Sequence, residues 1–156
     1  TEGYEGFYHL NDIQGSVEGT TLRYIIRDFD RQHFEERKQF VQTTVENFAK
    51  EKNVTIDLEV KDQYYNMGEI IKDHMELIEI AKKAFLKNEV EPKIQPIRGG
   101  TDGSRLSYMG LPTPNIFTGG HNYHGKLELV PLESMEKCKE IVLSIIDEFR
   151  TISKVK

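Results

Sequence analysis

The sequence has 156 residues, of which 37% are hydrophobic and 30% are charged, a composition typical of a folded globular protein of one domain or parts of two. Its net charge of -5, with Lys and Arg interleaved among acidic residues, excludes a broad basic surface, so nucleic acid is not an expected partner. No apolar run reaches the roughly 18–20 residues of a membrane span, and the single Cys138 suits a reducing compartment, so we expect a cytoplasmic protein without a membrane partner.

The first part of the chain shows strand patterns around one long helix. Residues 6–10 and 20–30 are rich in Tyr, Phe, Ile and Leu, and the turn-prone stretch between them predicts a β-hairpin. Residues 30–53 have apolar side chains at helical spacing, with Asp30 placed to cap the helix. Residues 54–62 alternate with a period of two, which predicts a further strand of an antiparallel sheet with one solvated face.

The second part has the order helix, strand, helix, strand, helix. Residues 69–88 and 132–152 show helical patterns. Residues 92–120 predict two short strands that end in glycines, on either side of a short helix that Gly110 terminates. This order favours α/β packing on a more parallel sheet. We therefore predict an α+β part joined near Asn66 to an α/β part.

Two features predict that this chain continues a longer one. It opens at Thr1, without an initiator Met, and passes almost at once into strand-like alternation. The α/β part has only two predicted strands, whereas a parallel sheet needs several covered strands. The missing strands are expected to come from residues outside this sequence.

Two glycine-rich loops, "IRGGTDG" and "IFTGGHNYHG", follow the two predicted strands. Ligands of open α/β sheets bind beyond the carboxyl ends of the strands, so these loops are candidate binding elements. Gly99 and Gly100 let the backbone approach a ligand closely, and Thr101 and Asp102 stand at the start of a helix whose free N–H groups favour an anion. The alternative is that Thr101 or Asp102 only caps that helix.

His121 and His124 lie three residues apart in the second of these loops. A zinc site needs three or four donors, and no cysteine cluster or HExxH motif accompanies them, so surface or turn histidines are the alternative to metal ligands.

Two polar residues of the first part are further candidates. Arg27 ends a strand of apolar and aromatic residues, where a guanidinium can grip a carboxylate, or it can pair with Asp28 or Asp30. Asn66, at the junction of the two parts, can present its amide to a ligand or only form a turn.

Five stretches together closely resemble the tripeptide aminopeptidases of the M20 family of zinc metallopeptidases: "TEGYEGFYHL", "YIIRDFDRQHFEERK", "YYNM", "IRGGTDGSRLSYMGLPTPNIFTGG" and "NYHGKLELVPLESMEK". They run in the family's order over nearly the whole chain. The resemblance implies a catalytic domain with two bridged zinc ions and a smaller lid domain that closes over the substrate and often dimerises. Residues 1–66 resemble the second part of the lid, and residues 67–156 resemble the C-terminal part of the catalytic domain.

The resemblance also implies roles for single residues. His124 matches the family's C-terminal zinc ligand, whereas His121 receives no ligand role. Arg27 matches the lid arginine that holds the free carboxylate of a tripeptide substrate. Gly100, Thr101 and Asp102 match the loop that lines the substrate cleft. Asn66 is a further substrate-binding candidate.

The sequence departs from the family pattern in one respect: no segment matches the region that supplies the other zinc ligands and the glutamate general base. We therefore expect a C-terminal fragment of a dinuclear zinc aminopeptidase, which removes the N-terminal residue of tripeptides by attack of a metal-activated water. The isolated chain is expected neither to bind zinc tightly nor to hydrolyse peptides. The alternatives are a non-catalytic binding or assembly module, and a homodimer whose half-sheets pair between chains and intertwine.

Overall fold

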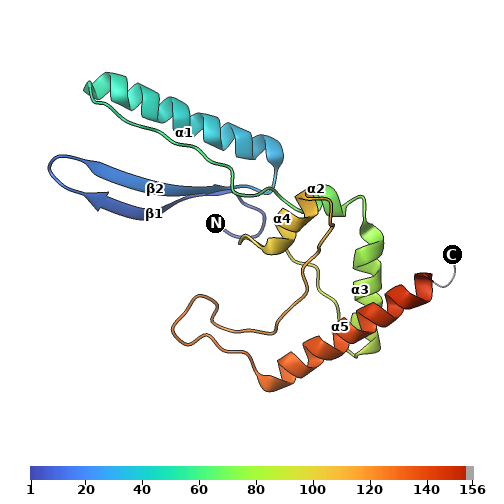
Figure 1. Cartoon of the computed structure of the whole chain (residues 1–156). Coiled ribbons are helices and arrows are strands. Elements are labelled where there is room, and N and C mark those ends of the chain that lie inside the picture. Colours follow the sequence, from blue (N-terminus) through green and yellow to red (C-terminus); the bar gives the residue numbers. More distant parts are fainter. Residues whose placement is uncertain (154–156) are drawn as a thin grey trace. The chain divides into compact units, whose positions relative to one another are not determined.

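The computed structural model describes residues 1–153 (Figure 1), so the last three positions of the predicted second part lie outside the described residues. The chain divides into two units. Unit 1 contains Thr1–Asn66 together with Pro96–Gly100. Unit 2 contains Met67–Gln95 and the described residues from Thr101 onward.

Unit 1 begins with the predicted β-hairpin, which is confirmed. Strand β1 (Phe7–Gly15) pairs antiparallel with β2 (Thr20–Arg27), and a register shift lies between Leu10 and Asp12. The pattern predicted a first strand that ends at residue 10, but β1 continues to Gly15. Most residues of this extension are exposed, so the sequence shows no alternation of apolar and polar residues there. The strand is defined instead by its backbone pairing with β2.

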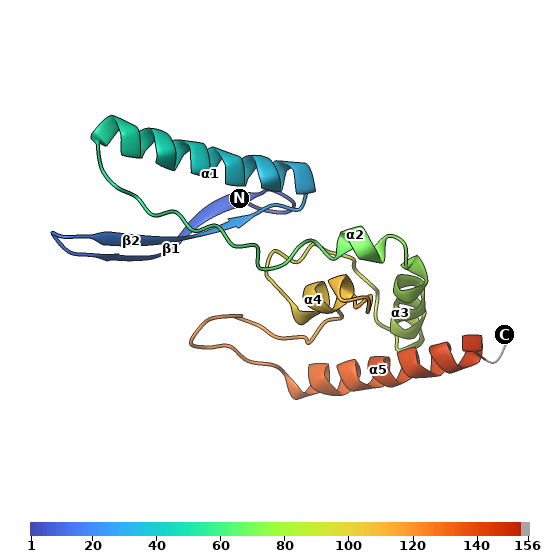
Figure 2. The ribbon, with the colours of Figure 1, turned by 45° about the horizontal axis from the view of Figure 1, so that its top comes forward.

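Helix α1 (Arg31–Lys52) follows, close to the bounds that the sequence predicts. The Asp30 carboxylate caps it by accepting a hydrogen bond from the His33 N–H at 2.8 Å. Asn53 ends it in the left-handed conformation with φ of 52°, which asparagine tolerates better than most residues. In Figures 1 and 2 the helix lies along the hairpin, and its closest strand is β2.

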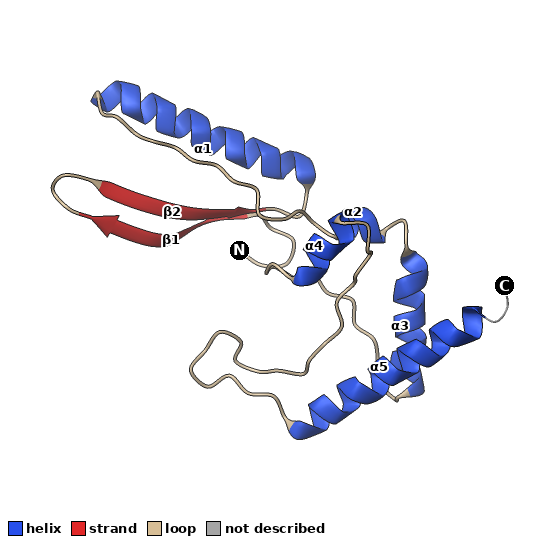
Figure 3. Cartoon of the chain, in the orientation of Figure 1, coloured by secondary structure: helices blue, strands red, loops and turns tan. Residues whose placement is uncertain are grey.

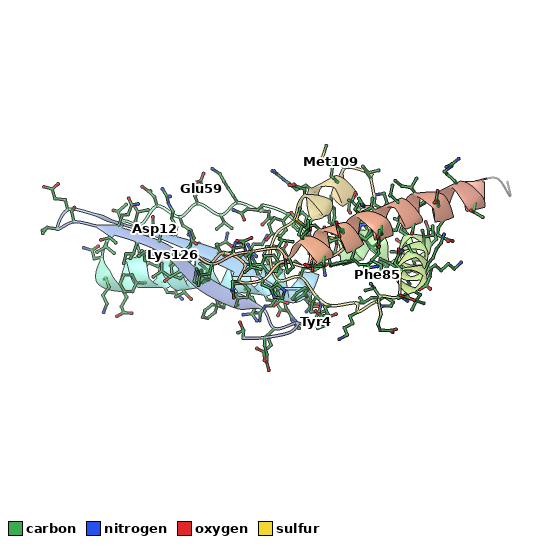
Figure 4. All side chains as sticks on the ribbon, turned by 90° about the horizontal axis from the view of Figure 1, so that it is seen from below. Tyr4, Asp12, Glu59, Phe85, Met109 and Lys126 are labelled. Atoms are coloured by element: carbon green, nitrogen blue, oxygen red, sulfur yellow. The ribbon has the colours of Figure 1, made fainter. Side chains whose placement is uncertain are left out.

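The strand predicted over residues 54–62 is not formed among the described residues. The segment is extended but pairs with no strand, and Figure 3 shows it as a loop that returns along α1. Its apolar side chains, Val54, Ile56, Leu58 and Val60, are 38–48% exposed. Figure 4 shows the row of side chains along this run, with Glu59 labelled. The period of two is present, but a sheet strand also needs a hydrogen-bonded neighbour.

Unit 2 is helical. Its elements are α2 (Gly68–Ile71), α3 (Met75–Lys87), α4 (Asp102–Tyr108) and α5 (Leu132–Ser153). The small core contains Ile80 and Ala84 of α3 with Ile141 of α5, and Asn88 joins the two helices by donating from Nδ2 to the Ser144 hydroxyl at 2.8 Å. None of the helices within residues 1–153 has the length and apolar character needed to cross a membrane.

The two short strands predicted within residues 92–120 are also not formed in the described chain, where these segments are irregular. A strand needs at least one hydrogen-bonded neighbour, and in the described part of unit 2 there is only an isolated bridge between His121 and Leu129. The short helix between them is confirmed as α4, and Gly110, with φ of 94°, follows its last turn as expected. The antiparallel hairpin and the helices agree with the predicted α+β fold class.

Candidate functional site

Arg27 lies at the end of β2, half-buried in unit 1. Its Nη1 donates a hydrogen bond to the carbonyl oxygen of Arg98 at 2.6 Å. Its guanidinium carbon lies 5.6 Å from the centre of the Tyr64 ring, within the range of a cation–π contact. Arg27 thus touches two segments that are distant in sequence.

The ion pairs that the sequence offers as an alternative for Arg27 are absent among the residues that the structure describes. Asp28 instead receives a hydrogen bond from Nε of Arg37 at 2.7 Å, and Asp30 is occupied as the cap of α1. Burial of the Asp28 carboxyl opposes its ionisation, but hydrogen bonds from Arg37 and from the Asp30 N–H, with the positive charge of Arg37, outweigh burial and lower the pKa of Asp28 below its ordinary value of 3.8.

The segment 96–100 belongs to unit 1 through a second arginine that sequence reasoning missed. Arg98 donates from Nη2 to the Thr1 hydroxyl at 2.8 Å and to the Glu5 carbonyl oxygen at 3.0 Å, and its guanidinium lies 5.1 Å from the centre of the Phe7 ring. The sequence feature that could have identified Arg98 is its position directly before the two glycines of "IRGG". This arginine fixes the glycine segment against the start of the hairpin.

Tyr64 is a third residue that sequence reasoning did not single out. Its ring packs against Gly100 so closely that a Cβ on Gly100 would lie 2.5 Å from Cε1. The same ring faces Arg27, so Tyr64 joins two of the predicted substrate-binding residues. Burial raises the pKa of Tyr64, against the opposing effect of the Arg27 charge, so the side chain remains a neutral phenol.

Asn66 is half-buried, and its Nδ2 donates to the Phe29 carbonyl oxygen at 3.0 Å. This bond ties the end of unit 1 to the turn between β2 and α1. One amide N–H of Asn66 is therefore committed to the backbone.

In unit 2, Thr101 occupies the N-cap position of α4 but makes no capping hydrogen bond with its side chain. Its hydroxyl oxygen instead accepts from Nδ2 of Asn115 at 3.1 Å, and Asn115 is a further residue that sequence reasoning missed. Asp102 begins the helix with an exposed side chain. The Thr101 side chain therefore does not act as a cap of α4.

His124 and His121 lie in the exposed loop before α5. His124 has a positive φ of 63°, and its backbone N–H donates to the Glu128 carboxylate at 3.0 Å. His121 is held through its backbone, which exchanges hydrogen bonds with Leu129 at 2.8 and 3.2 Å. Both histidines are thus placed by backbone bonds.

Whether these residues can form a metal site depends on how many donor side chains lie close together. Within residues 1–153 no three side chains of His, Cys, Asp or Glu lie together in a way that could hold a metal ion. Because zinc takes three or four protein ligands, the described residues do not by themselves fit a zinc site. His124 remains a single candidate ligand.

The candidates fall into two groups. Arg27, Asn66 and Gly100 belong to unit 1, where Tyr64 brings Arg27 and Gly100 together. Thr101, Asp102 and His124 belong to unit 2. The loop "GGTD" therefore contributes residues to both units.

Comparison with known proteins gives close relatives. The chain is 55% identical over 148 residues to peptidase T of Caldanaerobacter subterraneus, 54% over 155 residues to peptidase T of Exiguobacterium sibiricum, and 55% over 150 residues to peptidase T of Bacillus subtilis. These matches cover 94–99% of the chain but only 36–38% of each relative. No protein-family model matches the chain.

A solved structure agrees at the level of the fold. The crystal structure of aminopeptidase PepT from Bacillus cereus superimposes with a TM-score of 0.72, at 24% sequence identity, over 92% of this chain and 40% of that one. The chain thus spans little more than a third of the length of its sequence relatives. The chain is similar to a C-terminal portion of peptidase T.

Proposed function

We propose that this chain is the C-terminal part of a tripeptide aminopeptidase and that it supplies residues that bind and orient the peptide. The single observation that carries this proposal is the identity of 54–55% to peptidase T over nearly the whole chain. Residues 1–66 are assigned to the lid and residues 67–156 to the catalytic domain. The complete hydrolytic activity is assigned to a longer, cytoplasmic protein.

Arg27 is proposed to anchor the free carboxylate of the peptide. Its Nη1 is occupied by the Arg98 carbonyl, which leaves the other N–H groups of the guanidinium for a ligand. An arginine fork matches a carboxylate through paired hydrogen bonds. Holding the far end of a tripeptide fixes which peptide bond reaches the reacting groups.

The remaining candidates are proposed to line the path of the peptide. Gly100 is proposed to face the peptide with its backbone, because the Tyr64 ring fills the space where a side chain would stand. Thr101 and Asp102 offer a hydroxyl and a carboxylate. Asn66 is a further candidate for binding the peptide. His124 is assigned to the metal centre as one ligand, and the remaining ligands are assigned to residues outside the described chain.

The anchor role can be tested in the intact enzyme by comparing tripeptides with their C-terminal amides. Arg27→Ala is expected to raise KM for tripeptides by roughly 10- to 100-fold, because a charge-assisted contact is lost, and to abolish the preference over the amides. Arg23→Ala is the matched control, because Arg23 lies on the same strand with its side chain 68% exposed. An Arg27→Ala enzyme that keeps the normal preference would contradict the anchor.

A second candidate function is a non-catalytic module for binding or assembly. The exposed apolar row at Val54, Ile56, Leu58 and Val60 favours it, because such a row invites another strand. The mass of the native protein in its source cell separates the two candidates. A protein more than twice the size of this chain supports the peptidase, whereas a protein of this size supports the module.

A further inference from the structure

The Tyr64 ring lies between two groups that the proposed function uses. The Arg27 guanidinium is 5.6 Å from the centre of the ring, and Gly100 packs against the ring edge from Cε1 to the hydroxyl. All three residues belong to unit 1, so their relative placement does not depend on unit 2.

The hydroxyl of Tyr64 does not explain this arrangement. It is buried and has no hydrogen-bond partner within the described part of the chain, a situation that disfavours folding. A phenylalanine ring would fill the same space without that penalty. The useful part of Tyr64 in this position is therefore the face of its ring.

The ring face and the Arg98 carbonyl hold the Arg27 guanidinium from two directions. The carbonyl accepts from Nη1 at 2.6 Å, and the aromatic ring attracts the cation through its electron-rich face. Together they restrict the rotamers of a long, flexible side chain. A guanidinium that is ordered before the ligand arrives loses less entropy on binding.

We propose that Tyr64 is a positioning residue, which sets the Arg27 guanidinium for the carboxylate of the peptide through its ring face, and that Gly100 leaves the space the ring needs. This inference rests on the proposed anchor role of Arg27. It adds a specificity-determining residue that makes no contact with the substrate itself.

The first test compares two substitutions in the intact enzyme. Tyr64→Leu removes the ring and is expected to raise KM for tripeptides by roughly 2- to 30-fold, with kcat and the KM of C-terminal amides nearly unchanged. Tyr64→Phe keeps the ring and is expected to retain the normal KM, because the hydroxyl makes no hydrogen bond within residues 1–153. A general structural defect would instead lower kcat for both substrates.

A comparison of two aromatic substitutions covers the case in which Tyr64→Leu does not fold. Phenylalanine and 4-fluorophenylalanine at position 64 both fit the space of the tyrosine ring and its hydroxyl, but fluorine withdraws electrons from the ring face. KM for tripeptides is expected to be higher with 4-fluorophenylalanine while the melting temperature stays constant. An equal KM for the two variants would overturn the role of Tyr64.

The same measurements separate failure of this inference from failure of the proposed function. If Arg27→Ala loses the preference for free carboxylates and the position-64 variants keep it, Arg27 is the anchor and Tyr64 does not position it. If Arg27→Ala keeps the preference, the anchor role fails, and the role of Tyr64 fails with it.

Discussion

Arg27, Arg37 and Arg98 of unit 1 are each held between an oxygen atom and an aromatic ring. The pairs are the Arg98 carbonyl and Tyr64 for Arg27, Asp28 and Tyr8 for Arg37, and the Glu5 carbonyl and Phe7 for Arg98. A planar guanidinium can donate in its plane while its flat face stacks on a ring, whereas an ammonium group has no flat face to stack. Lysine is therefore a poor replacement at these positions.

The contact between Gly100 and Tyr64 predicts that the two glycines of "IRGG" differ in their tolerance of a methyl group. In Gly100→Ala the new Cβ would meet a packed ring at 2.5 Å, and the free energy of unfolding is expected to fall by about 1–3 kcal/mol. Gly99→Ala is the control, because a Cβ there meets nothing within 4 Å, and it is expected to change stability by less than about 0.5 kcal/mol. Equal stabilities by urea denaturation would contradict the contact.

The ion pair of Asp28 and Arg37 predicts a dependence of stability on pH. The folded-state pKa of Asp28 is lower than its ordinary value of 3.8, so the pair stabilises the fold fully above that value and loses this effect as pH falls toward the folded-state pKa. Asp28→Asn is expected to cost about 1.5–3 kcal/mol at pH 7, because the Asp28 side chain is only 5% exposed.

The measurement is thermal unfolding of wild type and variant between pH 3 and 7. The difference in melting temperature should shrink below about pH 4. Glu51→Gln serves as the control, since Glu51 and its partner Lys52 are 69% and 54% exposed. A difference that stays constant down to pH 3 would exclude the proposed linkage.

At the scale of elements, the sequence predicts those features that local signals determine. Helix α1 combines a helical period with a cap at Asp30 and a left-handed stop at Asn53, so both of its ends can be read from nearby residues. The run 54–62 has an equally clear period, but whether it becomes a strand depends on a neighbour that no local pattern reveals.

The same distinction applies to the candidate site. Arg27 and Gly100 can be recognised from their neighbours in the sequence. Arg27 follows a run of apolar and aromatic residues, and Gly100 is one of two adjacent glycines. Tyr64, which joins them, precedes another tyrosine in a stretch without periodicity, and its role arises only from a contact across 36 positions of the chain. The sequence therefore points to Arg27 and Gly100 but not to Tyr64, the residue that contacts both.

The packing of α3 on α5 predicts a strong effect at one position. Ile141 is fully buried between the helices, so Ile141→Ala is expected to lower the free energy of unfolding by about 2–5 kcal/mol through lost burial and a cavity. Leu143→Ala is the matched control on the same helix, because Leu143 is 56% exposed, and its cost should stay below about 1 kcal/mol. Chemical denaturation of both variants measures the difference, and equal costs would place the core elsewhere.

At the scale of the whole molecule, the two units are interleaved in sequence. The chain passes from unit 1 to unit 2 after Asn66, returns for Pro96–Gly100, and leaves again at Thr101. Unit 1 therefore depends on a short segment that lies between helices of unit 2 in the sequence. The contacts of Arg27 and Arg98 and the packing of Tyr64 on Gly100 hold this segment in unit 1.

The unpaired run 54–62 predicts self-association when this chain is isolated. Its backbone has no neighbouring strand among residues 1–153, and the side chains of Ile56 and Leu58 are 40% and 43% exposed. Pairing with a second copy would satisfy the backbone and bury apolar surface. The mass measured by size exclusion with light scattering is therefore expected to rise with concentration. Ile56→Lys should shift this rise to higher concentration, whereas Thr55→Lys, on the other face of the period, should change it less. A monomer at every concentration would mean that the side chains of α1 already protect the run, and the proposed homodimer would be excluded.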